Sequence, residues 1–303
     1  MALPHMHAPE YEIEPYPPTN PRTKLEISEG FSWGDVAATY SCSARDIFYF
    51  NFKTFTPEEI NWYMWNYLGR TKLASDGKNL TFGVDPGNPS AKTAPPSKFK
   101  PGDHPWVYIP PTGWPTPSQN DEDLRSAVLS TLAQAEVAGL ALHVGDLTLH
   151  PGELKTVRTN IKRRKVEVRH NSAISTTGQY RHRNWQVPRN TLEFRILKPT
   201  GTFGHSNIVH EAVHVALDTR GKHVKVAKSE ALAYLAQALY LVRKGVPPHT
   251  TLDPFARPML AAAEVIAYMM ESGATVDSAQ IIPLFGAIAA AYPAGSYDYD
   301  GLL

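Results

Sequence analysis

The sequence contains almost no cysteine, since Cys42 is the single thiol in 303 residues. One cysteine excludes an intramolecular disulfide and is typical of a protein that folds in a reducing compartment. Uninterrupted apolar runs of about 18 residues, the length needed to cross a bilayer, are also missing. We therefore expect no membrane span.

An excess of charge of one sign is missing as well. The formal net charge is +1, which gives the chain no overall attraction to nucleic acid or to membrane surfaces. Basic residues gather locally at 162–165 and 181–183. A solvated strand face or turn accounts for them, so we expect no nucleic-acid partner.

The first residues, Met1–Pro21, are polar and rich in proline. They lack the apolar segment of a secretory signal peptide. We expect synthesis in the cytoplasm without a Sec-type signal, so that any export would use a specialised secretion system.

A proline-rich stretch at Pro110–Pro117 predicts a boundary between two domains. With 42% apolar residues, the chain can bury two separate cores. The predicted organisation is a flexible tail at 1–22, a small domain at 23–110, a linker at 111–120 and a second domain at 121–303.

The most informative feature is the stretch His210-Glu211-Ala212-Val213-His214, which has the pattern HExxH. On a helix this spacing places two imidazoles one turn apart with a carboxylate beside them. The pattern predicts a zinc hydrolase. Because so short a motif also arises by chance, its surroundings must decide.

The surroundings favour a helix that follows a strand. Residues 191–197 alternate and are β-prone, and residues 199–204 are typical of a loop. Ser206 or Asn207 can cap a helix that runs from Ile208 to about Thr219.

Polar residues form a stripe along this otherwise apolar helix, with His210, His214 and Asp218 at positions i, i+4 and i+8. Such a stripe needs partners inside the protein. The alternative to a metal is a pair of core histidines that hydrogen bond to the backbone.

Zinc requires a third protein ligand and an open fourth position for water. We predict that Glu230 supplies it, from the first turn of a second helix at Ala227 to about Lys244. The alternative is a glutamate that merely complements the helix dipole. Asp218 is a competing ligand, but its place one turn after His214 suits an orienting hydrogen bond from an imidazole.

The stretch 210–214, followed by Ser229-Glu230-Ala231-Leu232-Ala233-Tyr234-Leu235-Ala236-Gln237-Ala238-Leu239-Tyr240, resembles the gluzincin branch of zinc metallopeptidases. It is similar in particular to bacterial toxin-like zincins with an EAxAYxAQAL helix. The resemblance implies a zinc site formed by His210, His214 and Glu230. The spacing between His214 and Glu230 is shorter than in thermolysin-type enzymes, which leaves the substrate and subfamily open.

The implied mechanism assigns one role to each residue. Zinc polarises the scissile carbonyl and activates water, while Glu211 takes the proton of that water and delivers it to the leaving amine. His223 and Tyr234 are candidates for stabilising the oxyanion. Each has an ordinary alternative, as a loop residue and a core residue respectively.

Residues 25–51 and the closing segment 99–110 resemble a LysM module, a small βααβ unit. The chain departs from that family by a long insertion at about 52–98. The resemblance implies binding of a peptidoglycan-like or chitin-like glycan. Four aromatic residues of the insertion either stack on sugars or form a small core that clamps it to the module: Trp62, Tyr63, Trp65 and Tyr67.

The predicted fold class is α+β, with a small LysM-like domain followed by a mostly helical zincin domain that carries a small sheet. The predicted function is that of a peptidase toxin or effector, with a protein or peptide substrate and a secretion-machine carrier or immunity protein as further partners. The alternatives are a structural or docking component of an injection machine with a non-catalytic zinc site, and a cell-wall glycan-binding protein.

Overall fold

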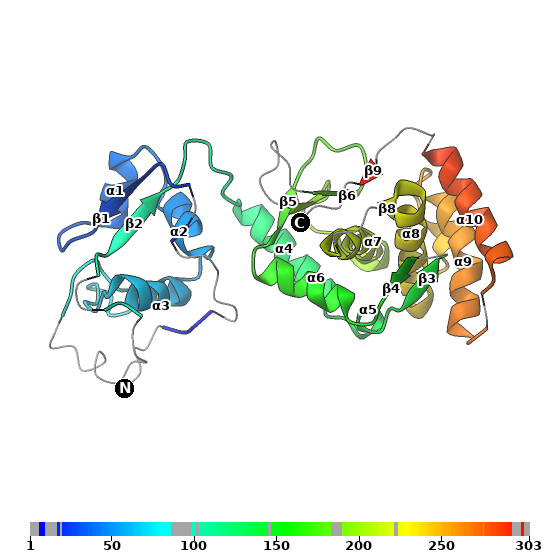
Figure 1. Cartoon of the computed structure of the whole chain (residues 1–303), viewed down its shortest axis with the longest axis horizontal. Helices are drawn as coiled ribbons and strands as arrows, with labels where there is room; N and C mark the ends of the chain where they lie inside the picture. Colours follow the sequence, from blue (N-terminus) through cyan, green and yellow to red (C-terminus); the bar gives the residue numbers. More distant parts are fainter. Residues whose placement is uncertain are drawn as a thin grey trace. The chain divides into compact units, whose positions relative to one another are not determined.

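The computed structural model describes residues 6–9, 17, 18, 20–85, 98–100, 103–144, 147–182, 190–220, 224–274, 276–292, 298 and 299. The chain divides into two compact units, residues 1–116 and 117–303 (Figure 1). The division lies within the proline-rich segment 111–120. Helices and small sheets make up both units, so the predicted α+β class is confirmed.

In its described residues, the first unit holds a two-stranded sheet with three helices between the strands. Its elements are β1 (Thr23–Glu26), α1 (Trp33–Thr39), α2 (Ala44–Phe52), α3 (Pro57–Leu68) and β2 (Trp106–Ile109). The strands are antiparallel, with Thr23 opposite Ile109 and Glu26 opposite Trp106. The closing strand is shorter than the predicted 99–110, because Pro105 has no N–H with which to extend the ladder.

Aromatic side chains form much of the core of this unit. The ring of Trp33 meets those of Phe52 and Phe82 edge to face, and Phe52 stacks on Tyr63. Tyr63 and Trp65, both from the predicted insertion, are buried. These two aromatic residues therefore act as core residues that hold α3 within the unit. Of the two alternatives for the insertion, they fit the small core and not the stacking on sugars.

The second unit combines three small sheets with a stack of helices. Its elements are α4 (Gln119–Thr131), α5 (Ala135–Ala138), β3 (Leu142–Val144), β4 (Leu147–Leu149), α6 (Glu153–Lys162), β5 (Val166–His170), β6 (Gly178–Arg181), β7 (Asn190–Phe194), α7 (Gly201–Thr219), β8 (Val224–Lys225), α8 (Val226–Arg243), the 3-10 turn η2 (Pro248–Thr250), α9 (Arg257–Glu271), α10 (Ser278–Ala291) and β9 (Asp298–Tyr299).

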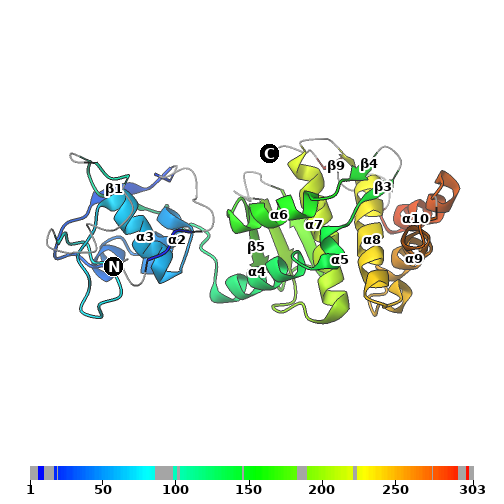
Figure 2. The ribbon, with the colours of Figure 1, turned by 90° about the horizontal axis from the view of Figure 1, so that it is seen from below.

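The largest sheet has the order β5-β7-β6, with β5 parallel and β6 antiparallel to the central strand. The pairs β3-β4 and β8-β9 are antiparallel. Figure 2 shows the sheet, α7, α8 and then α9 with α10 as successive layers, and contacts of α7 with β6 and α8, and of α8 with α9, agree with that order.

This layering puts α7 and α8 in the interior. Every residue of α7 from Ile208 to Asp218 and every residue of α8 from Ser229 to Leu241 is buried. A helix that is covered on all sides cannot turn its polar residues to water. The polar side chains of these two helices must therefore find partners inside the protein or hold a ligand.

Two predicted boundaries are wrong. Helix α7 begins at Gly201 instead of Ile208, so Ser206 and Asn207 lie inside it and do not cap it. The glycine-rich start suggested a loop, but Gly201 adopts φ +70°, a conformation that favours glycine, and leads directly into the helix. The amphipathic residues 121–139 predict a single helix, but the structure divides them into α4 and α5, because the backbone of Gln134 is extended.

No helix in the described ranges has the length and apolar character that crossing a bilayer requires.

Candidate metal centre

Three buried side chains from two helices converge on one point. His210 and His214 come from α7, and Glu230 comes from α8. The Nε2 atoms of the two histidines are 3.2 Å apart. Glu230 places Oε2 3.4 Å from Nε2 of His210 and Oε1 3.5 Å from Nε2 of His214. Within the described part of the chain, this is the group of histidine, cysteine and acidic residues close enough to share a metal ion.

These distances fit a tetrahedral metal site. Ligand atoms about 2.0 to 2.1 Å from a common centre lie about 3.3 to 3.4 Å from one another when the site is tetrahedral. The separation between the two imidazole nitrogens is close to that value, and each nitrogen lies at a similar distance from one of the two oxygens of Glu230. Two imidazole nitrogens and one carboxylate leave a fourth position open, which is the donor set of catalytic zinc sites. The geometry therefore supports a metal ion, and it does not by itself fix which ion.

The alternative of a histidine pair bonded to the backbone does not hold. The Nε2 atoms of His210 and His214 face each other, and the nearest acceptor is the carboxylate of Glu230. Nδ1 of His210 is buried without a hydrogen-bond partner among the described residues. Buried polar atoms are normally paired, so an unpaired Nδ1 is not what a histidine that the backbone satisfies would show.

Glu230 lies deeper in its helix than predicted. Helix α8 begins at Val226, which makes Glu230 its fifth residue, and no acidic residue stands in the first turn. The side chain is only 6% exposed. A glutamate in this position does little for the helix dipole, which acts within the first turn. This position favours a metal donor over a residue that complements the helix dipole.

The burial of these groups determines their charge in the metal-free protein. Burial lowers the pKa of His214 to about 4, so that its imidazole is neutral and keeps a free lone pair. Burial also acts to raise the pKa of Glu230, but the neighbouring His214 and His210 hold it below its ordinary value. His214 and Glu230 are therefore in the protonation state that metal binding requires. Burial acts to lower the pKa of His210, but the neighbouring Glu230 and Glu211 hold it above its ordinary value, so a metal must displace a proton from this imidazole.

Ser229 orients one of the donors. Its hydroxyl oxygen lies 2.8 Å from Nδ1 of His214, so a residue of α8 fixes the ring of a residue of α7. Hydrogen bonds of this kind hold a metal-binding imidazole in one orientation. No pattern in the sequence indicates this role except that Ser229 precedes Glu230.

Asp218 does not have the role that the sequence predicted. Its Oδ2 accepts hydrogen bonds from the Tyr180 hydroxyl at 2.5 Å and from Asn190 Nδ2 at 3.4 Å. Both partners belong to the sheet, which contacts the last turn of α7. The carboxylate therefore ties α7 to the sheet and does not orient an imidazole.

Glu211 lies beside the donors and is not one of them. Its side chain rests against Gly178 on β6, where an added Cβ would approach Cγ of Glu211 to 3.1 Å. The backbone N–H of Tyr180 donates to its carboxyl group, and burial raises its pKa to about 7. A carboxyl group with a pKa near neutrality can both accept and release a proton.

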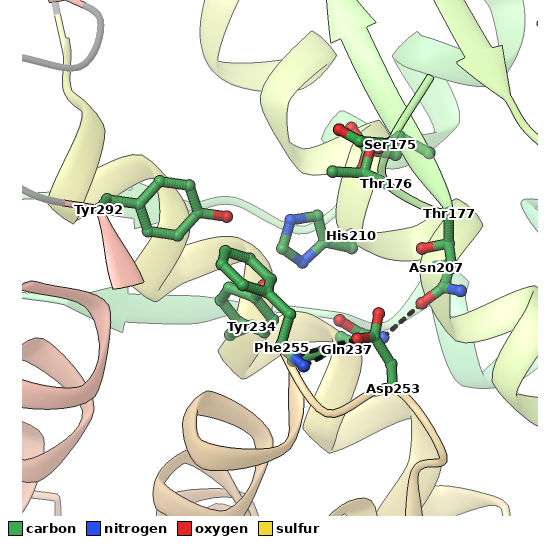
Figure 3. Close-up of a pocket in the computed structure, with 13 residues that line it drawn as sticks. Ser175, Thr176, Thr177, Asn207, His210, Tyr234, Gln237, Asp253, Phe255 and Tyr292 are labelled. Carbon is green, nitrogen blue, oxygen red and sulfur yellow. Dashed lines mark hydrogen bonds between the residues drawn. The ribbon is translucent and has the colours of Figure 1, made fainter. Parts of the chain in front are cut away.

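Glu211 and His210 also line a cavity of about 380 Å³ (Figure 3). This volume is in the range of small-molecule and peptide sites. The wall is built from the connection before β6, from α7 and α8, from the loop before α9 and from the residue after α10: Ser175, Thr176, Thr177, Gly178, Asn207, His210, Glu211, Tyr234, Gln237, Asp253, Phe255, Ala256 and Tyr292.

Tyr234 lies in the wall of this cavity, where a residue that stabilises the oxyanion must lie. Its ring centroid is 4.5 Å from that of His210, with the planes at 71°. The other candidate, His223, lies outside the described residues. Tyr292 was not predicted, yet its hydroxyl donates to Oε2 of Glu230 at 3.3 Å and is hydrogen bonded to Tyr234. Burial raises the pKa of both phenols, so both keep their protons.

Comparisons with protein-family models, curated proteins and solved structures found no match to the chain. The resemblances to gluzincins and to LysM modules therefore remain resemblances of short motifs. A function can therefore be inferred only from the geometry of the site.

Proposed function

We propose that this protein is a zinc-dependent peptidase of the gluzincin type. The observation that carries the proposal is the convergence of His210, His214 and Glu230 at tetrahedral spacing, beside a cavity that also exposes Glu211. His210 is both a donor and part of the cavity wall. A bound substrate can thus reach the centre from the cavity.

Zinc fits the donor set, and when bound it polarises a carbonyl group and lowers the pKa of water. Three side chains would hold it: His210, His214 and Glu230. The chain's own contribution to the reaction is then the transfer of protons. Glu211 takes a proton from the attacking water and delivers it to the leaving amine, which requires a carboxyl group in the cavity that is not a ligand.

Two phenol hydroxyl groups can donate hydrogen bonds to the oxyanion. Tyr234 and Tyr292 retain their protons, line the same cavity and lie next to the metal centre. Hydrogen-bond donors held in place before the reaction stabilise developing negative charge without reorganisation. We assign the oxyanion role to Tyr234 together with Tyr292.

The first unit is proposed to place the enzyme and not to take part in chemistry. Its β1, α1, α2 and β2 follow the order of the LysM-like pattern, and every proposed site residue belongs to the second unit. We propose a docking or glycan-binding role, with peptidoglycan or chitin-like glycan as ligand, and a toxin or effector role for the whole chain. An immunity protein or secretion carrier would then be a partner.

A structural zinc site is the second candidate, and one observation favours it. The donors lie between α7 and α8, in the part of the second unit where the core is most completely buried. A metal there would stabilise the fold even without catalysis. The cavity with Glu211 distinguishes the two functions, since a structural site needs neither an open position nor a general base.

Hydrolysis of a peptide library by the zinc-loaded full chain, followed by mass spectrometry, tests the proposal. We expect defined cleavage products that disappear when a chelator removes the metal and return when zinc is added. Metal binding with no cleavage of any peptide would favour the structural site. Co-sedimentation of residues 1–303 with insoluble peptidoglycan or chitin tests the docking role separately.

A further inference from the structure

The cavity beside the metal centre has acidic groups and, among its described lining residues, no lysine or arginine. Glu211 and Asp253 belong to its wall. An uncompensated carboxylate inside a partly closed site attracts a positive charge, because the low surrounding dielectric strengthens the interaction. The cavity is therefore suited to a cationic group.

Asp253 is held in place by its own loop. Its Oδ1 accepts hydrogen bonds from the backbone N–H of Phe255 at 2.9 Å and from that of Ala256 at 3.3 Å. These bonds fix the direction of the carboxylate and use one of its two oxygens. Figure 3 shows Asp253 on the side of the cavity where Asn207 and Gln237 also present their amide groups.

An exposed aromatic ring stands beside this carboxylate. Phe255 lines the same cavity, is 45% exposed and meets the ring of Tyr292 edge to face at 5.6 Å. A large apolar side chain left this open is available to a ligand. The loop thus offers an apolar surface next to a fixed negative charge.

We propose that Asp253 and Phe255 form a subsite for a Lys or Arg side chain of the substrate, next to the bond that is cleaved. The side chains of Lys and Arg each have an apolar stem and a cationic end. The stem matches the ring of Phe255, and the cation matches the carboxylate of Asp253. The subsite rests on the proposed peptidase function, because it names the substrate class of that site.

Two peptide series that differ in one group test the subsite. One series places Arg at each position of a peptide in turn, and the other places citrulline at the same positions. Citrulline keeps the shape of Arg without its charge. We expect the parent protein to cleave an Arg peptide at least roughly tenfold faster, as kcat/KM, than its citrulline partner, as for a close charge pair. In Asp253→Asn the two rates should become similar, because the amide carries no charge that distinguishes Arg from citrulline.

The variants keep the loop intact. The amide oxygen of asparagine can still accept the hydrogen bonds from Phe255 and Ala256, so Asp253→Asn should fold normally. Asp123→Asn is the matched control, because Asp123 is an exposed residue of α4 that does not line the cavity. It should keep the preference for Arg.

A binding measurement separates this proposal from the peptidase function. Fluorescence anisotropy of the labelled Arg and citrulline peptides is recorded with zinc-loaded Glu211→Gln and with Glu211→Gln/Asp253→Asn. Binding that favours Arg and depends on Asp253, with no hydrolysis by the parent, would support the subsite and contradict the peptidase function. Hydrolysis with equal rates for Arg and citrulline, or with a preference unchanged by Asp253→Asn, would overturn the subsite alone. Neither hydrolysis nor a binding preference would overturn both.

Discussion

The hydroxyl oxygen of Ser229 lies 2.8 Å from Nδ1 of His214, so the residue just before one donor orients another donor on a different helix. This contact links α8 to α7 at the metal centre. It also means that the ring of His214 is positioned before a metal binds. A centre arranged in advance loses less entropy on binding.

Removal of that hydroxyl should weaken metal binding. We expect Ser229→Ala to lower zinc affinity by roughly 10- to 100-fold, the effect typical of losing a hydrogen bond to a metal-binding imidazole. Competition with a chromogenic chelator measures it. Ser229→Thr, which keeps a hydroxyl group, should retain most of the affinity. Equal affinities of parent and Ser229→Ala would show that the contact does not act on the metal.

Glu230 and Asp218 should respond differently to substitution. Glu230→Ala removes a donor, so zinc content and thermal stability should fall together, because metal binding energy is partly folding energy. Asp218→Asn weakens a tie between α7 and the sheet and should lower thermal stability with zinc content unchanged. Atomic emission and melting temperature, each with and without chelator, distinguish these outcomes. Loss of zinc in Asp218→Asn but not in Glu230→Ala would show that Asp218, and not Glu230, is the metal donor.

The stability of the metal-free protein should depend on pH through Glu211. Burial raises the pKa of this carboxyl to about 7 from 4.5, so the folded protein holds the proton more tightly than the unfolded chain. Its contribution to stability is complete below pH 4.5 and is lost as the pH rises through 7. Glu211→Gln should then match the parent in acid and exceed it above neutrality, by about 1.4 kcal/mol for each unit of raised pKa.

Urea unfolding of the chelator-treated proteins at acidic and at mildly alkaline pH measures this difference. Glu136→Gln is the control. Lys244 lowers the pKa of Glu136, so this substitution should change stability above neutrality in the opposite direction to Glu211→Gln. If the parent protein is as stable as Glu211→Gln above neutrality, the ionisation of Glu211 does not destabilise the folded protein, and the prediction is wrong.

The metal donors could be predicted because the information is local. The spacing of His210 and His214 places them on one helix turn, and Glu230 begins the apolar part of the next helix. The two helices are consecutive long elements that contact each other directly. The roles of Ser229 and Asp218 depend on which neighbour each side chain meets, and the sequence pattern does not contain that information.

The cavity could not be predicted for the same reason. Gly178, Asp253 and Tyr292 come from β6, from the loop before α9 and from the end of α10, and only the packing of these elements brings them together. None belongs to a motif. The start of α7 was misplaced because glycines at 201 and 204 suggest a loop, whereas here Gly201 adopts a positive φ and Gly204 allows a tight approach to Pro199.

Hydrolysis by zinc-loaded Glu211→Gln, compared with the parent on a peptide that the parent cleaves, tests the central claim most directly. The amide has the shape of the carboxyl group but cannot accept a proton from water at neutral pH. We predict equal zinc content and a melting temperature no lower than that of the parent, with turnover reduced by at least roughly 100-fold. Equal turnover of the two proteins would contradict the peptidase mechanism and leave a structural zinc site as the better account.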